Sequence, residues 1–416
     1  MRNKLLPGIL YVAAVQALFV AGTERASGQG LPLGRTTSDW EVSAPVSLFA
    51  TLGGVHPRYP TIESASDDYV YALAWAPDPA INEARLYLRT RMPSGVWLPA
   101  VKVSDDASGW TTQARLAVTR DGGVLLAAWP AAGDVHLALS RDHGQTFSAP
   151  VAVDGPVGLQ VDVAIDREDG VHLAWRAQDA TGVWDVYYAH SLVPARRGLP
   201  LAFSHWQNLT NDPVLQDAPS IAVDDAGNVF VAFVSAPGPS YESELIELTR
   251  GRTQRRRLQQ LDGDLQVSTG GLNMVAPFFR LNSADQSAIP YALVRCAEPF
   301  DFWGMEIPTS GWRTIPGKAR SSRIDETGMI TVLSEAVGLY GLSVDIELTR
   351  SFDCGRTFTL PIAVTYWTNP PKGHWGTNPA LAVDRHGTAH MLWDGPYQDA
   401  FDGFDIIYVG ARYVRQ

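Results

Sequence analysis

Loops that combine aromatic and carboxylate side chains recur along this sequence, between segments rich in apolar residues. Such loops are typical of sugar-binding surfaces. A pyranose ring has an apolar face that packs on an aromatic ring, and a polar rim that needs fixed hydrogen-bonding groups. The loop tryptophans that we predict to contact a carbohydrate are Trp184, Trp303, Trp367 and Trp375.

The overall charge and the absence of several motifs exclude other kinds of chemistry. The 416-residue chain has a formal net charge of −11, which argues against a nucleic-acid partner because phosphate binding needs a basic surface. The sequence holds no HExxH, paired CxxC or EF-hand pattern, and no GxSxG, Walker A or dinucleotide-binding motif. We therefore predict no metal site and no cofactor.

Two octapeptides, SRDHGQTF at 140–147 and SFDCGRTF at 351–358, share the pattern Ser-x-Asp-x-Gly-x-Thr-Phe. The Asp carboxylate can accept backbone N–H groups across a tight turn, the Gly can supply a positive φ, and the Phe can pack between sheets. We therefore predict structural roles for Asp142, Gly144 and Phe147, and for Asp353, Gly355 and Phe358.

A longer repeat accounts for most of the chain. It consists of an apolar run, an Asp-rich turn and a second apolar run, as in VDVAIDREDGVHLAW (161–175) and ALAVDRHGTAHMLW (380–393). This is a β-hairpin signature. A third and usually a fourth short apolar segment follow, with a period of about fifty residues. The turn glycines are Gly123, Gly170, Gly227, Gly328 and Gly387, and weaker copies lie at 61–75 and 280–294.

These seven copies predict an all-β fold, a single β-propeller of four-stranded blades. Seven blades are expected, or six if a weak copy is not a blade. The last copy stops after its third strand, while DWEVSAPVSLFA (39–50) resembles a fourth strand. We predict that this N-terminal strand completes the C-terminal blade and removes open sheet edges. The propeller domain would span 36–416.

The propeller geometry assigns each loop to one of two faces. Loops from the second strand to the third, and from one blade to the next, open on what we predict to be the functional face. The hairpin turns and the two octapeptides open on the other face. By this assignment Cys296 lies on the functional face and Cys354 on the other. We therefore predict two free thiols.

The two octapeptides resemble the Asp-box of sialidases and other BNR-repeat propellers. The resemblance implies a sialidase-like glycan-active hydrolase, an exo-glycosidase acting on an acidic or branched sugar. HPRYP (56–60) is similar to the Arg-Ile-Pro motif of sialidases, which implies that Arg58 binds a substrate carboxylate. Asp78 would then have the position of the acid/base residue.

The same resemblance implies further site residues. Two more arginines should complete the carboxylate clamp, and Arg295 and Arg323 are placed on the functional face. Sialidases use a tyrosine nucleophile with a glutamate partner. The candidates for that pair are Tyr340 or Tyr397 with Glu242 or Glu244.

Two other functions stay open, so the sequence does not decide whether the protein is an enzyme. The aromatic loops also fit a non-catalytic, lectin-like propeller that binds glycan or a protein partner. BNR-type propellers also include polysaccharide lyases that use His and Tyr with an arginine. The residues that this implies are His56, His374, Tyr366, Tyr397 and Arg58.

Residues 1–28 predict a secretory signal peptide, with basic residues at Arg2 and Lys4, an apolar run from Leu5 to Gly22, and small residues after it. An uncleaved membrane anchor is the alternative, because the run is close to the length that spans a bilayer. No later segment is apolar over such a length. We predict a secreted or periplasmic mature protein that does not span the membrane.

Overall fold

The chain divides into two compact units, Met1–Pro32 and Leu33–Gln416. The computed structural model describes residues 39–49, 57–78, 80, 83–104, 114–198, 200–237, 241–249, 252–260, 266–281, 288–296, 318–337, 344–365, 377–396 and 404–414. All of these lie in the second unit. The predicted signal peptide lies outside the described residues.

The described residues form seven antiparallel sheets, numbered here in chain order. Sheet 1 contains β3 (Arg58–Ser64), β4 (Val70–Asp78), β5 (Glu83–Arg91) and β6 (Val101–Lys102). Sheet 2 contains β7 (Arg115–Val118), β8 (Leu125–Ala131), β9 (Asp134–Ser140) and β10 (Val151–Val153). Sheet 3 contains β11 (Gly158–Ile165), β12 (Val171–Gln178), β13 (Trp184–His190) and β14 (Gln207–Asn208). Sheet 4 contains β15 (Leu215–Val223), β16 (Val229–Ala236), β17 (Glu242–Thr249) and β18 (Arg252–Gln260).

The remaining sheets depart from this pattern in two places. Sheet 5 has three described strands, β19 (Ser268–Gly270), β20 (Asn273–Leu281) and β21 (Ala288–Arg295). Sheet 6 contains β22 (Lys318–Ile324), β23 (Ile330–Val337), β24 (Val344–Ser351) and β25 (Ile362–Ala363). Sheet 7 joins β26 (Thr377–Val383), β27 (Ala389–Pro396) and β28 (Phe404–Tyr413) to β1 (Trp40–Val42) and β2 (Val46–Ser47). The described residues include no α-helix.

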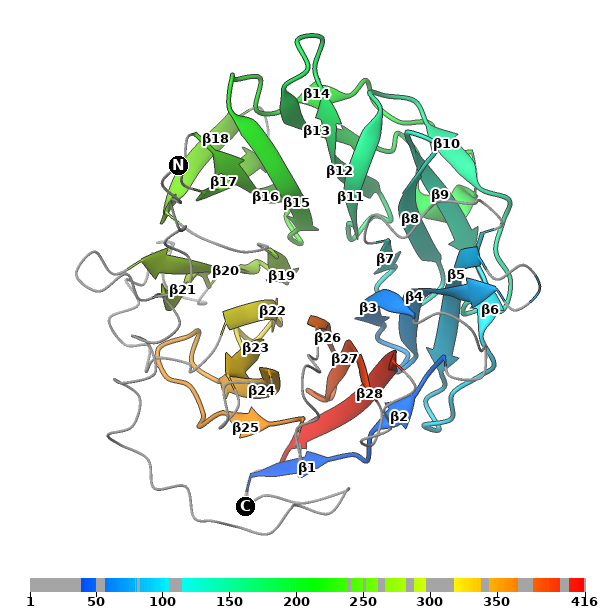
Figure 1. Ribbon diagram of the computed structural model, residues 1–416, viewed down its shortest axis with the longest axis vertical. Helices are drawn as coiled ribbons and strands as arrows, with labels where there is room; N and C mark the ends of the chain where they lie inside the picture. Colours follow the sequence, from blue (N-terminus) through cyan, green and yellow to red (C-terminus); the bar gives the residue numbers. More distant parts are fainter. Residues whose placement is uncertain are drawn as a thin grey trace, which may run out of the picture. The chain divides into compact units, whose positions relative to one another are not determined.

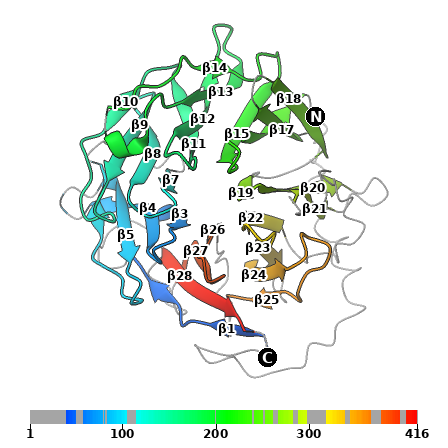
Figure 2. The ribbon, with the colours of Figure 1, turned by 180° about the vertical axis from the view of Figure 1, so that it is seen from behind.

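The sheets follow one another around a common centre, and the first strand of each lies innermost (Figures 1 and 2). Each innermost strand contacts the next along the chain, from β3 through β7, β11, β15, β19 and β22 to β26, and β26 contacts β3. The first strands therefore face a shared central space, and their residues line it.

Apolar residues on both faces of the second and third strands hold neighbouring sheets together. On β4, Leu73 and Trp75 pack toward sheet 2, whereas Ala72 and Ala74 pack toward sheet 7. Trp75 is 1% exposed. Truncating a side chain this large and this buried costs about 3–5 kcal/mol. The near-continuous apolar runs of the repeat are explained by this burial on two faces.

The Asp-rich turns of the repeat fix the hairpins between first and second strands. In four of these turns, an aspartate carboxylate accepts the backbone N–H groups two and four residues further on, at 2.7–3.0 Å. The aspartates are Asp166, Asp224, Asp325 and Asp384. The residue three positions after the aspartate has a positive φ. It is glycine except in sheet 3, where Asp169 takes a φ of 65°.

The hydrogen bonds within the two octapeptides match each other. Asp142 accepts the N–H of Thr146 at 2.9 Å and its hydroxyl at 2.6 Å, and Asp353 accepts those of Thr357 at 2.8 and 2.6 Å. Gly144 and Gly355 both have a φ of 80°. Phe147 packs against the core between sheets 1 and 2, and Phe358 against the core that contains Ile324 and Ile330.

The fourth residue of each octapeptide contacts the preceding sheet. His143 and Cys354 have left-handed φ values of 56° and 57°. His143 Nδ1 is 2.9 Å from the hydroxyl of Tyr71 in sheet 1. Cys354 forms a disulfide with Cys296, which follows the last strand of sheet 5. The prediction of two free thiols is therefore wrong.

The wrong prediction of free thiols results from one repeat copy whose strands were assigned incorrectly. The segment 280–294 does not form a first and a second strand. It forms the second and third strands, β20 and β21, and the turn between β19 and β20 lies at Gly271–Leu272 instead. Cys296 therefore follows a third strand, as the octapeptides do, and lies on the same face as Cys354. The sequence misled us because this copy has no Asp-Gly turn.

The N-terminal segment pairs with the last strand of the chain. Trp40–Val42 aligns antiparallel with Ala411–Tyr413, and Val46–Ser47 with Ile407–Tyr408. The carboxylate of Asp405, which is 3% exposed, accepts hydrogen bonds from the hydroxyl of Ser47 and the N–H of Phe49.

Among the described residues, no helix is long and apolar enough to cross a membrane.

Candidate functional site

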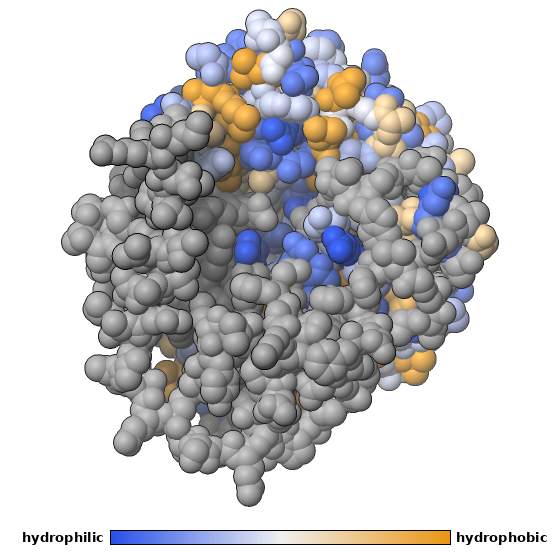
Figure 3. All heavy atoms as spheres, in the orientation of Figure 1, coloured by the Kyte–Doolittle hydropathy of each residue, from blue (hydrophilic) through white to orange (hydrophobic). Residues whose placement is uncertain are grey.

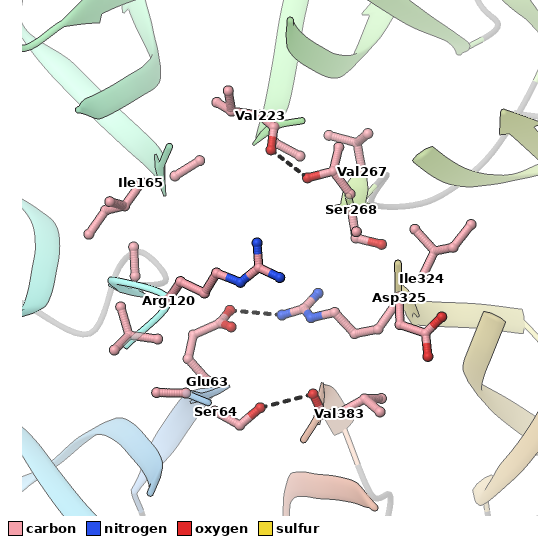
Figure 4. Close-up of a pocket in the computed structure, with 18 of the residues that line it drawn as sticks. Glu63, Ser64, Arg120, Ile165, Val223, Val267, Ser268, Ile324, Asp325 and Val383 are labelled. Carbon is pink, nitrogen blue, oxygen red and sulfur yellow. Dashed lines mark hydrogen bonds and ion pairs between the residues drawn. The ribbon is translucent and has the colours of Figure 1, made fainter. Parts of the chain in front are cut away.

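A cavity of about 660 Å³ lies between the innermost strands and the hairpin turns that follow them. Figure 4 shows charged side chains from several sheets that point into it. Hydrophilic residues also gather at the centre of the face in Figure 3. Among the residues that line the cavity, Glu63, Arg115, Asp162 and Arg323 stand on innermost strands.

Glu63 and Arg323 form an ion pair inside the cavity. Arg323 Nη2 lies 2.8 Å from Glu63 Oε1, although β3 and β22 belong to sheets 1 and 6. Burial raises the pKa of Glu63 above its usual range, and the nearby charge of Asp162 adds to this rise. The charges of Arg323 and Arg115 oppose the shift without cancelling it. Glu63 is therefore more easily protonated than an exposed glutamate.

A second carboxylate lies near this pair. Asp162 Oδ1 is 3.2 Å from Arg115 Nε, and Asp162 Oδ2 accepts the N–H of Ile221 at 2.8 Å. These contacts join sheets 2, 3 and 4 at the cavity wall. Of the carboxyl groups that line the cavity, the two on innermost strands, Glu63 and Asp162, have unlike surroundings, and each lies next to an arginine. Such a pair suits general acid–base chemistry.

One end of the cavity is formed by the hairpin turns, and Arg120 connects three of these turns there. It belongs to the turn of sheet 2 and pairs with Asp225 in sheet 4, at 3.4 Å, and with Glu326 in sheet 6. Figure 4 shows it reaching into the central space. These pairs are partly exposed, so each contributes little to stability. They narrow this end of the cavity.

Two buried His–Tyr pairs lie inside the sheets. His172 Nδ1 is 2.9 Å from Tyr188 Oη and His172 Nε2 is 3.0 Å from Asp166 Oδ2. His390 repeats this with Tyr408 at 2.8 Å and with Asp384 at 3.1 Å. Each set ties a turn aspartate to the second and third strands. Both histidines are under 10% exposed, so we assign these pairs to structure.

The sequence-predicted residues that the structure describes do not gather in one place. Arg58 is exposed and opposes Trp75, away from the hairpin turn of sheet 1. Asp78 ends β4 on the same side. The N–H of Ala80 lowers its pKa most, with a further contribution from Lys102 at 3.4 Å, although desolvation opposes the shift. A carboxylate with a lowered pKa is a poor proton donor at neutral pH.

The face assignment of two arginines is wrong. Arg295 ends β21 and opposes Met274, and Arg323 opposes Thr331, so both lie at the hairpin-turn end of their sheets. The prediction for Arg295 failed because its segment forms the third strand of sheet 5 and not the second. Its guanidinium pairs with Asp224 at 2.6 Å and Glu247 at 2.9 Å. Arg323 lines the cavity. Arg58 lies at the opposite end of its strand, so these registers do not form one carboxylate clamp.

Two further predicted residues lie at the ends of third strands. Glu242 begins β17, and its carboxylate is 3.6 Å from Arg257. Its neighbour Glu244 is 1% exposed and pairs with Arg255 at 2.5 Å. Trp184 begins β13, and the guanidinium of Arg176 lies over its ring, 4.3 Å from the ring centre. The predicted residues outside the described part are His56, Trp303, Tyr340, Tyr366, Trp367, His374, Trp375 and Tyr397.

Sequence reasoning missed Glu63, Arg115 and Asp162. A signal for them was present, because each is a charged residue inside the apolar run that forms the first strand of its copy. An apolar run of this kind predicts a core strand, and its pattern alone does not show which residues face the centre. The described residues hold no group of three or more His, Cys, Asp and Glu that could bind a metal ion.

No family model matches this sequence, and no curated protein matches it. The fold is similar to that of several solved proteins. Polysaccharide lyase Uly1 aligns with a TM-score of 0.53 and 8% identity, over 85% of this chain and 90% of its own. The α-L-arabinofuranosidase Arb93A from Fusarium graminearum gives 0.50 and 11%, over 89% and 97%. The β-propeller domain of the Trilobed protease from Pyrococcus furiosus gives 0.50 and 8%, over 85% and 94%.

At these identities the likeness concerns the fold alone, and the three named proteins differ in what they do. The sheets, their order and these neighbours agree with one another. The chain therefore has the fold of a β-propeller protein.

Proposed function

We propose that this protein is a glycan-active hydrolase that binds an acidic sugar in the central cavity. The observation that carries the proposal is the ion pair between Glu63 and Arg323, in which the carboxyl group has a raised pKa. Because Glu63 has a raised pKa, Arg323 can release Glu63 and bind a carboxylate of the substrate in its place. The planar guanidinium suits that exchange, since it binds carboxylates with two parallel hydrogen bonds.

Substrate binding would then prepare the acid. Arg323 is the largest influence that keeps the pKa of Glu63 down against burial. When the substrate carboxylate takes Arg323, Glu63 loses that influence and takes up a proton. Protonated Glu63 gives this proton to the glycosidic oxygen as its bond to the anomeric carbon breaks.

Asp162 supplies the second carboxylate. Arg115 and the N–H of Ile221 fix its position. It accepts a proton from the water whose oxygen bonds to the anomeric carbon, so that water is divided between the two products. Asp78, Glu242 and the two candidate tyrosines are not needed in this mechanism.

We also propose the finer features of the fold, namely seven blades closed by the N-terminal strands. The seven sheets, the contact of β26 with β3 and the pairing of Trp40–Val42 with β28 support this. Export is part of the proposal, since a disulfide between Cys296 and Cys354 suits an oxidising compartment.

The test is turnover of fluorogenic sialosides, other glycosides and uronic polysaccharides by the purified protein. Glu63→Gln should lower kcat by about a hundredfold or more, because it removes the proton donor. Arg323→Met should mainly raise KM for acidic substrates. Glu168→Gln is the matched control, because Glu168 is an exposed carboxylate in a hairpin turn of the same face, and it should behave as wild type.

The alternatives give different results in the same assay. Full turnover by Glu63→Gln would reject the cavity site, and loss of turnover in Arg58→Ala alone would move the site to the other end of the strands. Glycan binding without turnover would indicate a lectin. A rise in ultraviolet absorbance from an unsaturated uronate would indicate a lyase.

A further inference from the structure

Three side chains meet where β11 and β15 begin, at the end of sheets 3 and 4 away from the hairpin turns. Arg176 Nη1 is 3.0 Å from Asp217 Oδ1, and the Arg176 guanidinium lies 4.3 Å from the ring centre of Trp184. We call Arg176, Trp184 and Asp217 the rim cluster. The sequence singled out Trp184 alone, and the central cavity does not include any of the three.

The backbone around the rim cluster is irregular, as it is at the start of β3, β22 and β26. The register shifts between Gly158 and Gln160 on β11, and between Asp217 and Ser220 on β15. Ala218 has a φ of 50°, which a non-glycine residue rarely adopts. Its N–H donates to Gln160 Oε1 at 3.0 Å and to Asp217 Oδ1 at 2.8 Å. Bulges of this kind re-aim side chains next to functional sites.

The same two strands continue into the cavity. Asp162 follows Gln160 by two residues on β11, and Ser220 follows Asp217 by three on β15, and both line the cavity. Two residues of a strand span about 7 Å, which is close to the length of one sugar unit. Gln160 is the ladder partner of Arg176, so the rim cluster begins one strand spacing away from this stretch of β11.

The chemistry of the rim cluster differs from that of the cavity. Arg176 and Asp217 cancel each other's charge, with side chains 16% and 37% exposed. Asp217 offers acceptors for sugar hydroxyls. The Arg176 Nε–H is buried and has no acceptor among the described residues. Trp184 is half-buried, so one part of its ring remains open beside this pair. An apolar plane next to a neutral pair of donor and acceptor fits an uncharged pyranose.

We propose that the rim cluster is a binding subsite for a neutral sugar unit, next to the cavity that takes the acidic one. The substrate class would then be a glycan with an acidic terminal unit joined to a neutral sugar. This inference rests on the proposed function for the cavity ligand, but the neutral sugar binds without any chemistry at Glu63.

The test is binding of lactose, maltotriose and mannotriose to the whole protein, followed by saturation-transfer NMR and calorimetry, with a galacturonate trisaccharide for comparison. At least one neutral probe should bind, and Trp184→Ala should weaken it about tenfold. Asp217→Asn should weaken it severalfold, and Trp184→Phe should retain most of it. Affinity should not change as NaCl rises from about 0.05 to 0.5 M, since the ligand has no charge.

Phe352→Ala is the control, because Phe352 is an exposed aromatic residue, 52% exposed, in an octapeptide on the other face. It should bind the neutral probe as wild type does. Failure of all three neutral probes to bind, or undiminished binding by Trp184→Ala, would overturn the proposal. Glu63→Gln separates the two sites: it should lower turnover by about a hundredfold or more and leave neutral-sugar binding intact. Binding that survives with no turnover in wild type would reject the proposed function and keep the subsite.

Discussion

Single carboxylates have two opposite roles in this protein, and their hydrogen bonds decide which. Asp142 and Asp353 receive N–H and O–H donors from their own turns. Desolvation is the largest single influence on each and raises the pKa, but the donors together outweigh it and lower the pKa. Glu63 faces burial with fewer compensating contacts, and its pKa is raised. We therefore assign the first two to structure, whereas the raised pKa of Glu63 is what the proposed role as proton donor needs.

The lowered pKa of Asp142 predicts a dependence of stability on pH. A group whose pKa is lower in the folded state adds stability above its unfolded value, about 4, and that stability disappears as pH falls through the folded value. Asp142→Asn should lower the free energy of unfolding by about 1–2 kcal/mol at neutral pH. The difference from wild type should shrink below about pH 4, as measured by urea denaturation across pH.

The control at this position is Gln145→Ala, since the Gln145 side chain donates only to the carbonyl of Asp142 from an exposed place. It should change stability little at any pH. A difference between Asp142→Asn and wild type that stays constant down to pH 2 would show that the charge of Asp142 is not what the turn uses.

At the scale of the element, the N-terminal strands depend on one buried carboxylate as well as on their backbone ladder. Asp405 holds Ser47 and Phe49 from the start of β28. Asp405→Asn should loosen residues 46–49, because one carboxylate oxygen becomes an NH₂ group. That group cannot accept the N–H groups of Phe49 and Ile406 that Oδ1 accepts, and it needs acceptors of its own. Hydrogen exchange of this segment should quicken while β26 and β27 keep their protection. Equal exchange in the variant and in wild type would mean that the ladder alone anchors the strands.

The strands could be predicted from sequence wherever the repeat keeps its Asp-Gly turn. Sheets 3 and 7, built from 161–175 and 380–393, have the predicted hairpins, and DWEVSAPV supplies the strands that pair with β28. The copy at 280–294 failed because apolar alternation is the same in every strand pair of a sheet. Only the turn tells a first strand from a second, and the turn between β19 and β20 is Gly271–Leu272.

The candidate site could be predicted only in part, for a different reason. Arg323 was identified from sequence, but its partner Glu63 belongs to a sheet more than two hundred residues away in the chain. Spacing cannot reveal that innermost strands from distant copies face one space. The charged residues inside first strands are the signal that a future reading of such repeats can use.

For the whole molecule, the disulfide between Cys296 and Cys354 is a covalent cross-link between two sheets in addition to the backbone. It joins sheets 5 and 6 across 58 residues of sequence. In the chain-entropy model a loop of this length stabilises the fold by about 4 kcal/mol. The double variant Cys296→Ser/Cys354→Ser should therefore have a lower denaturation midpoint, and reducing agent should lower the midpoint of wild type by a similar amount.

Thiol titration of the denatured, unreduced protein provides the matching check. It should find no reactive thiol in wild type. Two thiols per chain, or a double variant as stable as wild type, would contradict the pairing of Cys296 with Cys354.

The pairing of β1 and β2 with β28 also fixes the order in which this protein can be completed. A ribosome makes Trp40 long before Tyr413, and the two residues are partners in one ladder. The strands β1 and β2 therefore have no ladder partner until β28 has been synthesised. A chain released short of Phe404 leaves both of its ends without a neighbour, however well the five sheets between β7 and β25 have formed.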